Sequence, residues 1–442
     1  MSIRLPRRRR RHLLTLSALF YSLGAWSSLA VADVPQLDPV QTLTIPRFCN
    51  PLCSTSDSAL DGNTAMLPGS DNSVAVYRRG SDGEWVYRQT LRSPSLAEGL
   101  SEVFGRTIAL SGDLAILTGD FYDAEGNQTG SRIYVFHRTR GAWHFVQRVT
   151  LPFQNSPEAD FFLWNIELSG KNALMATQVF TPLPDSPGGS QSRRHVYAFR
   201  WDHGRLRRES EVLPSDAPVD VNSFYGVRVE LDGNTAFITG APQNNGPDGL
   251  AVVRAFERVG HKWQQRQVLR AVAGGGGGFF GLTLSIHGDR AAISAPYTSH
   301  STWYQGAVFV YRRHHGVWQQ EQKLVNPAAS EFPTPGDFIN FGVAQDIARN
   351  NLVIENTTSP LFHSARLFKR NIRSQQWQEA ARLGQPGTNV YDVHVQGSTA
   401  LVMEYALNSS LRASFYRLPR FVGSEEEPDV TETPLEALDE AQ

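Results

Sequence analysis

The amino-acid sequence predicts an all-β protein in which seven four-stranded sheets, or blades, stand in a closed ring as a seven-bladed β-propeller. Three observations predict it. One order of signals recurs seven times, each unit has room for four short strands but for no crossover helix, and a strand missing from the last unit has a counterpart near the N-terminus. Stacked units bury one continuous core, so we expect residues 33–420 to form a single domain.

The first 32 residues have the pattern of an export signal. Five consecutive arginines, Arg7 to Arg11, precede a largely apolar stretch from Leu13 to Leu29, and Ala30-Val31-Ala32 supplies the small residues of a cleavage site. The apolar stretch is short for a membrane anchor and is interrupted by serine and glycine. We therefore expect residues 1–32 to be removed, the mature chain to have no membrane span, and the protein to be periplasmic or secreted.

Two cysteines, Cys49 and Cys53, follow soon after the predicted cleavage site and are the only ones in the chain. In an exported protein, a Cys-x-x-x-Cys pair is typical of a disulfide that closes a tight loop. A metal site would need two further ligands. The sequence therefore predicts a Cys49–Cys53 disulfide.

Each repeat unit begins with two hydrophobic strands joined by a turn that is usually Gly-Asp or Gly-Asn. A variable loop follows, then a third strand that ends in an aromatic and a basic residue, and a fourth strand with tryptophan and leucine. The unit from Phe280 to Leu324 shows this order most clearly, and we expect its repeated aromatics, such as Phe309, Tyr311 and Trp318, to pack in the core. The turn residues are Gly62, Gly112, Gly170, Gly233, Gly288, Asn350-Asn351 in the sixth unit, and Gly397.

The seventh unit stops after its third strand, because Arg417 is followed by no strand with tryptophan and leucine. The segment 41–46, Gln-Thr-Leu-Thr-Ile-Pro, matches the fourth strand of the second unit at 147–152, Gln-Arg-Val-Thr-Leu-Pro. We therefore predict that residues near 41–46 pair with residues near 411–418 and complete the last blade. Such pairing closes the ring and removes the open edges that an unclosed array would expose.

These units resemble the FG-GAP repeats of the integrin α-chain propeller and its bacterial relatives, over about residues 41–418. The first half of that motif is present as Phe104-Gly105, Phe280-Gly281 and Phe341-Gly342. Its second half is present as Gly240-Ala241-Pro242 and Ser294-Ala295-Pro296. The fourth unit departs from the pattern with Phe224-Tyr225-Gly226. The resemblance implies a seven-bladed β-propeller and a role in binding proteins or glycans outside the cytoplasm.

Charge is spread unevenly along a chain whose formal net charge is −1. Residues 33–420 contain 36 basic and 35 acidic residues, a balance that gives no reason to expect nucleic acid or an anionic membrane as a partner. Residues 421–442 contain eight acids and no basic residue. We expect this acidic tail to be disordered.

The order of strands predicts that all the variable loops lie on one face of the ring. In an up-and-down blade, the turns between strands one and two and between strands three and four share a face, and here they are short. The connections between strands two and three, and from each blade to the next, share the opposite face. Long loops on a rigid scaffold are where binding residues concentrate. The variable stretches are 118–131, 177–194, 240–250, 294–305, 325–340 and 355–364.

Aromatic residues in these loops are the candidate ligand-binding side chains. The richest loop contains Tyr297, His300, Trp303 and Tyr304, and Tyr122 and Trp164 occupy comparable places. Exposed aromatic rings stack on sugars or anchor a partner protein. The alternative for Trp303 is that its ring folds back and covers a blade edge.

One oxygen-rich stretch, with Asp120, Asp123, Glu125 and Asn127, is the candidate metal loop. Calcium takes six to eight oxygen ligands. The stretch lacks the regular D-x-D-x-D-G spacing of integrin-type calcium loops, so a solvated loop is the competing interpretation. We expect no other cofactor.

Motifs for catalysis are absent: there is no G-x-S-x-G, no H-E-x-x-H and no Walker loop. The first hypothesis is therefore an exported, non-enzymatic binding or adhesion protein that presents its long loops to a protein or glycan ligand. The second is an extracellular polysaccharide-active enzyme, a lyase or hydrolase, with its site at the axial channel. The third is a scaffold for envelope complexes with the acidic tail as a tether.

Overall fold

The computed structural model describes the blades and leaves out both ends of the chain. The described residues are 34–45, 57–69, 72–95, 102–122, 128–151, 160–183, 190–216, 219, 225–240, 252–271, 278–298, 306–326, 340–357, 363–384, 388–406 and 410–419. The predicted signal at 1–32, the cysteines Cys49 and Cys53, and the acidic tail at 421–442 lie outside them. None of the helices in this part of the chain has the length and apolarity needed to cross a membrane.

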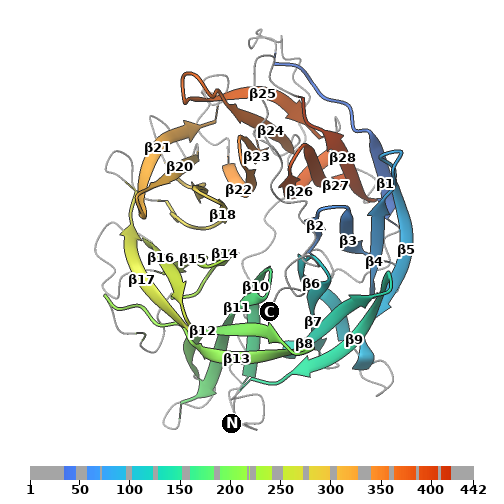
Figure 1. Ribbon diagram of the computed structural model, residues 1–442, viewed down its shortest axis with the longest axis vertical. Coiled ribbons are helices and arrows are strands. Elements are labelled where there is room, and N and C mark those ends of the chain that lie inside the picture. The colour runs from blue at the N-terminus through green and yellow to red at the C-terminus, as the bar shows by residue number, and fades with distance from the viewer. Residues whose placement is uncertain are drawn as a thin grey trace, which may run out of the picture. The chain divides into compact units, whose positions relative to one another are not determined.

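Seven four-stranded antiparallel sheets stand around one axis in the described residues, which confirms the predicted propeller (Figure 1). From the axis outward, blade 1 contains β2 (Ala59–Asp61), β3 (Thr64–Pro68), β4 (Ser73–Arg79) and β5 (Trp85–Arg92). Blade 2 contains β6 (Glu102–Ser111), β7 (Leu114–Tyr122), β8 (Gln128–Thr139) and β9 (Ala142–Val149). Blade 3 contains β10 (Asp160–Ser169), β11 (Asn172–Pro182), β12 (Ser190–Asp202) and β13 (Arg205–Glu211).

The remaining blades continue in the same order. Blade 4 contains β14 (Val229–Asp232), β15 (Thr235–Gly240), β16 (Val252–Val259) and β17 (Lys262–Leu269). Blade 5 contains β18 (Leu284–His287), β19 (Arg290–Ala295), β20 (Ala307–His314) and β21 (Val317–Val325). Blade 6 contains β22 (Asn340–Ala348), β23 (Asn351–Thr357), β24 (His363–Arg370) and β25 (Trp377–Leu383). Blade 7 contains β26 (Thr388–Gln396), β27 (Thr399–Ala406), β28 (Leu411–Arg417) and, outermost, β1 (Gln41–Ile45).

The hydrophobic cores lie between the blades. Seven buried clusters each combine side chains from two neighbouring sheets, and the repeated aromatics Phe309, Tyr311 and Trp318 are buried in one of them, as the sequence predicted. The cluster between blades 7 and 1 contains Ile45 together with Trp85 and Phe415, whose rings stack with centroids 4.5 Å apart. No blade is therefore stable by itself, because each of its two faces is covered only by a neighbour.

The FG pair has a packing role at the start of the innermost strand. Phe280 is fully buried, and Gly281 has φ +86°, a conformation that L side chains rarely adopt. A Cβ at Gly281 would lie 2.7 Å from Val253 of the preceding blade. The irregular fourth unit keeps this arrangement, because Tyr225 is buried in the place of the phenylalanine and Gly226 has φ +75°.

A glutamine on the outermost strand of one blade clasps the backbone of the next. Gln89 accepts from the Trp143 amide and donates to its carbonyl, both at 2.8 Å. Four further glutamines make the same pair of bonds to the equivalent residue of the following blade: Gln41 to Trp85, Gln147 to Leu206, Gln267 to Trp318, and Gln322 to Trp377. Each clasp satisfies two backbone groups on an outer strand that has no further partner strand.

Pairing of β1 with β28 closes the ring, as predicted. The strands are antiparallel, with Gln41 opposite Phe415 and Ile45 opposite Leu411. Gln41 then clasps Trp85 with bonds of 3.0 and 2.7 Å, so the N-terminal strand also holds blade 1. The resemblance between segments 41–46 and 147–152 is explained by this shared role of Gln41 and Gln147.

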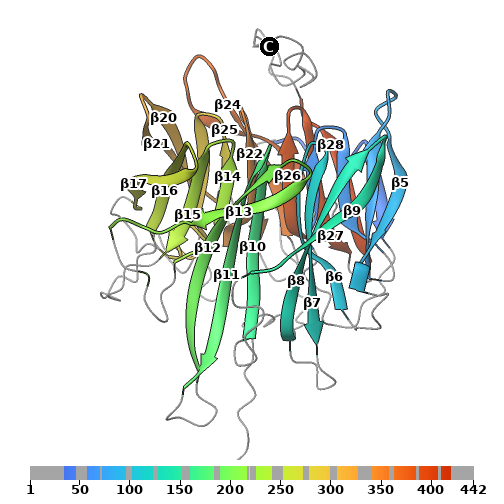
Figure 2. The ribbon, with the colours of Figure 1, turned by 60° about the horizontal axis from the view of Figure 1, so that its bottom comes forward.

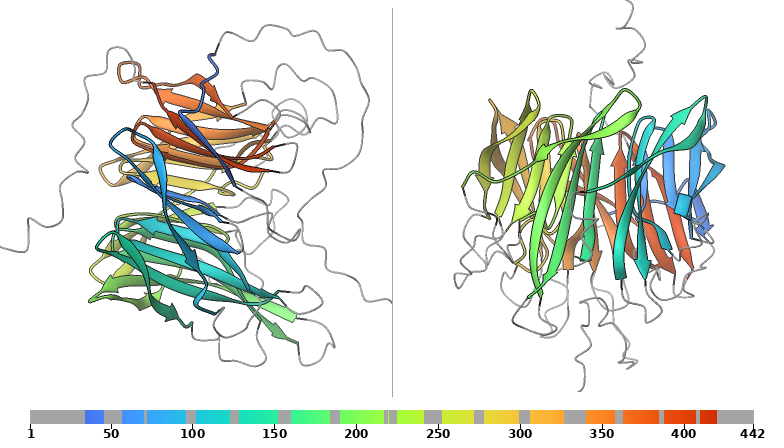
Figure 3. Two further views of the ribbon diagram at one scale, coloured as in Figure 1. Left: turned by 90° about the vertical axis from the view of Figure 1, so that its right-hand side faces the viewer. Right: turned by 90° about the horizontal axis from the view of Figure 1, so that it is seen from below.

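The short turns bind one another around one face of the ring, which we name the turn face. In blade 5, for example, the Gly288 amide donates to Asp232 of blade 4 at 2.6 Å, and in blade 4 the Gly233 amide donates to Ser169 of blade 3 at 2.8 Å. The predicted sixth turn is shifted by one residue: Arg349 and Asn350 form it, and Arg349 takes the glycine position with φ +55°. The opposite face, from which the connections between strands two and three leave, is named the loop face. Strands β7, β8, β11 and β12 project farthest toward it (Figures 2 and 3).

Deletion of residues 41–45 tests the closure. We expect the melting temperature to fall by roughly 10 °C, because β28 loses its partner and the core between blades 7 and 1 loses Ile45. Gln41→Ala and its matched control Gln89→Ala each remove one clasp and should cost about 1–2 kcal/mol. Differential scanning calorimetry checks both results. A deletion variant that melts like the wild type contradicts closure by β1.

Candidate functional site

Exposed aromatic side chains lie at the loop face, where strand one of each blade begins and strand two ends. Trp164 of blade 3 is 45% exposed, and Phe279 and Tyr297 of blade 5 are 64% and 36% exposed. Two of the three, Trp164 and Tyr297, were predicted from the sequence. Blade 4 separates the two groups, so the aromatic surface spans several blades.

Trp164 owes its position to an irregularity in β10. The pairing of β10 with β11 shifts register between Leu163 and Asn165, so Trp164 is the extra residue of a bulge. Bulges re-aim side chains, and here the indole donates to Gln178 at 2.9 Å while the guanidinium of Arg194 lies 4.8 Å from the ring centroid. The indole is thus held by two polar neighbours and still presents almost half of its surface to solvent.

Phe279 and Tyr297 form a second aromatic pair, with edge-to-face rings 5.3 Å apart. Phe279 has φ +59°, which is strained for a bulky residue and directs its ring outward. The Tyr297 amide donates to the Gly278 carbonyl at 3.2 Å, and a Cβ at Gly278 would lie 2.1 Å from the Tyr297 backbone. Glycine at 278 is therefore required for this approach.

Four of the predicted ligand-binding residues remain, and the structure describes one of them. Tyr122 is partly buried at the end of β7. His300, Trp303 and Tyr304 lie outside the described residues, so their role stays a prediction.

Asp120, the first residue of the candidate metal loop, is buried and accepts from the Ser131 hydroxyl at 2.7 Å. Burial raises the pKa of its carboxyl to about 6, and the nearby charge of Glu102 adds to this. Asp123, Glu125 and Asn127 lie outside the described residues. Within the described part of the chain, no three His, Cys, Asp or Glu side chains are grouped so that they could hold a metal ion.

A second cluster of polar side chains surrounds the propeller axis, on the innermost strands. Its side chains belong to the positions that lie three and five residues before the turn between strands one and two of each blade. The titratable members are Asp57, Glu167, Arg228, Glu230, Asp346, Asp392 and His394, and we name them the axial cluster. Glu167 on β10 feels the charges of Asp57 and His394, which come from blades 1 and 7. Residues far apart in the sequence are thus within electrostatic reach of one another.

Polar side chains at these axial positions, among them Asp346 of the axial cluster, cap the open edge of the next blade. Asp346 on β22 accepts from the Val395 amide of blade 7 at 2.6 Å and from the Ser285 hydroxyl at 2.7 Å. Ser285 in turn accepts from the Ile347 amide at 3.0 Å, and Asn165 accepts from the Val229 amide at 2.8 Å. Because strand one has no partner on its axial side, these side chains satisfy its otherwise unpaired N–H groups.

His394 and Asp392 form an ion pair, and the Ser58 hydroxyl contacts both of them. His394 Nε2 lies 3.0 Å from Asp392 Oδ2 and 2.9 Å from Ser58 Oγ, and the Ser58 hydroxyl donates to Asp392 Oδ2 at 2.6 Å. In a catalytic triad the carboxylate and the hydroxyl contact opposite nitrogens of the imidazole. Both partners here contact Nε2, so this trio does not activate Ser58 as a nucleophile.

Burial and mutual repulsion keep several axial carboxyls protonated near neutral pH. Burial, followed by the charge of Asp392, raises the pKa of Asp57 to about 7. Burial, with a contribution from the charge of Asp57, raises the pKa of Glu167 to about 8. Burial alone would lower the pKa of His394, but the Asp392 carboxylate outweighs it and raises that pKa to about 9. The site therefore holds protons that ordinary carboxylic acids have lost.

Sequence reasoning did not find the axial cluster or Phe279. The signal for the cluster was present, since polar residues recur at two fixed offsets from the turn in strands that are otherwise apolar, as in Asn165-Ile166-Glu167-Leu168 and Asp392-Val393-His394-Val395. The residue before Phe280 carried no such signal, because only the positive φ of Phe279 shows that its ring points outward.

Comparison with known proteins agrees with this geometry. The family model described as FG-GAP repeat matches residues 263–311, the segment that contains Phe280-Gly281 and Ser294-Ala295-Pro296. The chain is a seven-bladed β-propeller that contains an FG-GAP repeat in this segment. No curated protein sequence matches this FG-GAP propeller. Among solved structures, a putative 6-phosphogluconolactonase from Bacteroides fragilis is similar, with 13% identity and a TM-score of 0.45 over 85% of this chain and 95% of that chain. We infer nothing about activity from so distant a likeness.

The axial pKa shifts make the stability of the FG-GAP propeller depend on pH. The folded protein holds protons on Asp57 and Glu167 up to about pH 7 and 8, whereas the unfolded chain releases them near pH 4. His394 acts in the same direction between its ordinary value of 6.5 and about 9. The free energy of unfolding should therefore fall as pH rises from about 5.5 to about 8.5, by up to about 1.4 kcal/mol per pH unit for each group.

Urea unfolding at these two pH values checks the dependence. Glu167→Gln mimics the protonated acid, so this variant should be more stable than the wild type at about pH 5.5, where the unfolded wild type has already lost this proton, and by a larger margin at about pH 8.5. Equal free energies of unfolding of the wild type at both pH values would contradict the raised pKa values of the axial groups.

Proposed function

We propose that this FG-GAP propeller is an exported binding protein that holds a glycan on its loop face. The observation that carries the proposal is Trp164, an indole that a bulge directs outward and that remains 45% exposed. An aromatic face is the surface on which the C–H groups of a sugar ring stack, and its desolvation on binding is favourable.

Polar groups near Trp164 supply the hydrogen bonds that sugar hydroxyls need. Gln178, which accepts from the indole, carries a carboxamide group, and the guanidinium of Arg194 lies against the ring. Amides and guanidinium groups beside an aromatic plane bind hydroxyl-rich ligands through directed bonds. The strained Phe279 and its neighbour Tyr297 supply a second stacking surface two blades away, which suits a polymer longer than one sugar unit.

Binding to immobilised polysaccharides tests the proposal. Trp164→Ala should weaken capture about tenfold, as expected for the loss of one stacking side chain, and Phe279→Ala should weaken it less. Tyr87→Ala is the matched control, because Tyr87 is 52% exposed on the outer strand β5, away from the loop face. Surface plasmon resonance with a polysaccharide panel gives the affinities.

Wild-type affinity in the Trp164 variant would move the glycan site elsewhere. Absence of binding to every polysaccharide, together with capture of an envelope protein that Trp164→Ala abolishes, would assign the same face to a protein ligand.

A second candidate function, hydrolysis or lysis of a polysaccharide at the axis, is favoured by the state of Glu167. The raised pKa of Glu167 keeps this acid protonated at neutral pH, and its side chain accepts a hydrogen bond of 3.0 Å from the Asn165 amide. Unlike Asp346, it makes no described bond to a strand edge. A protonated carboxylic acid near ionisable groups is what general-acid cleavage of a glycosidic bond requires.

Product release from the same polysaccharides decides between the two candidates. If Glu167 is the acid, the wild type releases reducing ends and Glu167→Gln loses at least about 100-fold in rate, while Asp346→Asn, which changes an edge-capping carboxylate, serves as the control. Intact polymer after long incubation with the wild type rejects the enzyme. The scaffold hypothesis rests on the acidic tail at 421–442, outside the described residues, and stays a prediction.

A further inference from the structure

The turn face departs from its regular pattern at the junction of blades 5 and 6. Most turns between strands three and four are two residues long, as at Arg140-Gly141 and His315-Gly316, but residues 371–376 form a longer loop between β24 and β25. Asn371 organises this loop, because its side chain accepts from the amides of Arg373 and Ser374. The loop places Gln375, with φ +62°, over the end of blade 5.

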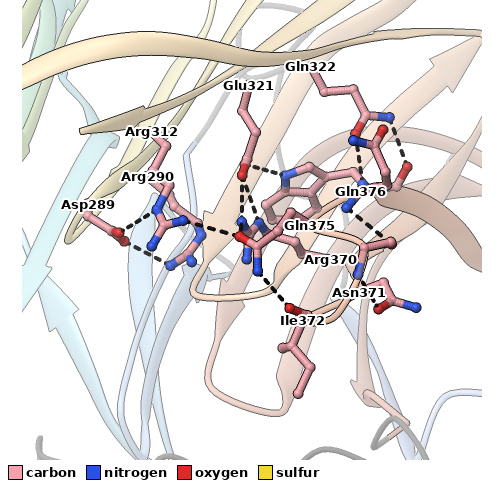
Figure 4. Close-up of polar contacts among 12 residues, drawn as sticks. Asp289, Arg290, Arg312, Glu321, Gln322, Arg370, Asn371, Ile372, Gln375 and Gln376 are labelled. Atoms are coloured by element: carbon pink, nitrogen blue, oxygen red, sulfur yellow. Dashed lines mark hydrogen bonds and ion pairs between the residues drawn. The ribbon is translucent and has the colours of Figure 1, made fainter. Parts of the chain in front are cut away.

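Three arginines converge beneath this loop (Figure 4). Arg290 and Arg312 of blade 5 share the carboxylate of Asp289, at 2.8 and 3.1 Å. Arg370 of blade 6 is paired with Glu321 at 2.6 Å, and the Trp377 indole donates to the other oxygen of Glu321 at 3.1 Å. Each carboxylate is thus fully engaged.

Gln375 occupies the position between the arginines. Its side-chain oxygen accepts from Arg312 at 3.2 Å and also from Arg370, and its amide donates to the Ile372 carbonyl at 2.6 Å. A neutral carboxamide oxygen therefore stands where two guanidinium groups meet. Gln375 itself is exposed, so a ligand can displace its side chain without disturbing the blades.

The charges in this cluster do not balance. Three arginines face two carboxylates, which leaves one positive charge, and Asp289 is divided between Arg290 and Arg312. Arg290 Nε is buried and has no hydrogen-bond partner among the described residues. Burial lowers the pKa of Arg290, and the charges of Arg370 and Arg312 act in the same direction. An anion placed at the Gln375 oxygen relieves this repulsion and gains charge-assisted hydrogen bonds from a planar donor set.

We propose that the arginine cluster of Arg290, Arg312 and Arg370 is a binding site for a sulfate or phosphate oxyanion, with Gln375 as the displaceable group that occupies it in the free protein. The site lies on the turn face, so it is separate from the glycan surface proposed on the loop face. Its ligand is either a free ion or the same group esterified to a polysaccharide.

Isothermal titration with sodium sulfate, at constant ionic strength set with sodium chloride, tests the site. Arg312→Met removes a donor and the surplus charge, and Gln375→Glu fills the site with the protein's own carboxylate, so each should weaken sulfate binding about tenfold or more. Gln375→Ala removes the competing oxygen and should bind at least as tightly as the wild type. Arg138→Met is the matched control, because Arg138 lies at the same face of blade 2 and its charge is balanced by one carboxylate, Asp113, at 2.6 Å.

Thermal unfolding separates specific binding from the general stabilisation that sulfate gives to folded proteins by exclusion from their surfaces. Specific binding raises the melting temperature of the wild type and of Arg138→Met more than that of Gln375→Glu. Parallel titrations with inorganic phosphate and with heparin, a sulfated polysaccharide, tell a free ion from an esterified one. The same sulfate affinity in the wild type, Arg312→Met and Gln375→Glu, or no heat in the wild type, would overturn the proposal.

Discussion

The fold depends on sharing each hydrophobic core between two neighbouring blades. All seven buried clusters lie across a blade junction, so a single four-stranded sheet has no core of its own. The glutamine clasps also join neighbouring blades, because Gln89 and its equivalents form hydrogen bonds with backbone groups of the following blade. Rigidity is therefore a property of the closed ring. The loop face inherits it, which is why Trp164 can be held at a fixed angle.

At the propeller axis, the inner edge of every blade has backbone N–H and C=O groups with no partner strand. Side chains from the preceding blade cap them, as Asp346 does for Val395 and Asn165 does for Val229. This arrangement brings carboxyls together in a partly buried place, and the raised pKa values of Asp57 and Glu167 follow from it. Glu167 makes no described bond to a strand edge, and its side chain accepts from the Asn165 amide at 3.0 Å, so it is the member we consider for another task.

Much of the architecture was predictable from the sequence because it is periodic. The recurring turn, the FG pair and the match between the segments around Gln41 and Gln147 predicted the number of blades and the closing strand, since each reflects a contact that every blade repeats. The turn of the sixth unit was misplaced by one residue, because asparagine at both 350 and 351 hid that Arg349 takes the left-handed conformation. In a turn without glycine, sequence alone does not place the positive φ.

The candidate sites were harder to predict because they break the repeat or combine several units. The outward ring of Phe279 depends on one backbone angle, and the arginine cluster joins Arg290, Arg312 and Arg370 through a loop that is longer in blade 6 than in its neighbours. Arg312 fits the basic residue that ends the third strand of each unit, and Arg290 lies outside the repeated pattern. Only their placement in space shows that two carboxylates serve three guanidinium groups.

The strand β1 also sets the order in which the molecule can assemble. Gln41 pairs with Phe415. The backbone hydrogen bonds of the first strand therefore form only when the last strand in the sequence, β28, is present. Contacts of such long sequence separation slow folding, and no partly synthesised chain can complete them. The emerging polypeptide must keep β1 unpaired until the whole chain is available, and the blades made early are protected only when that final strand arrives.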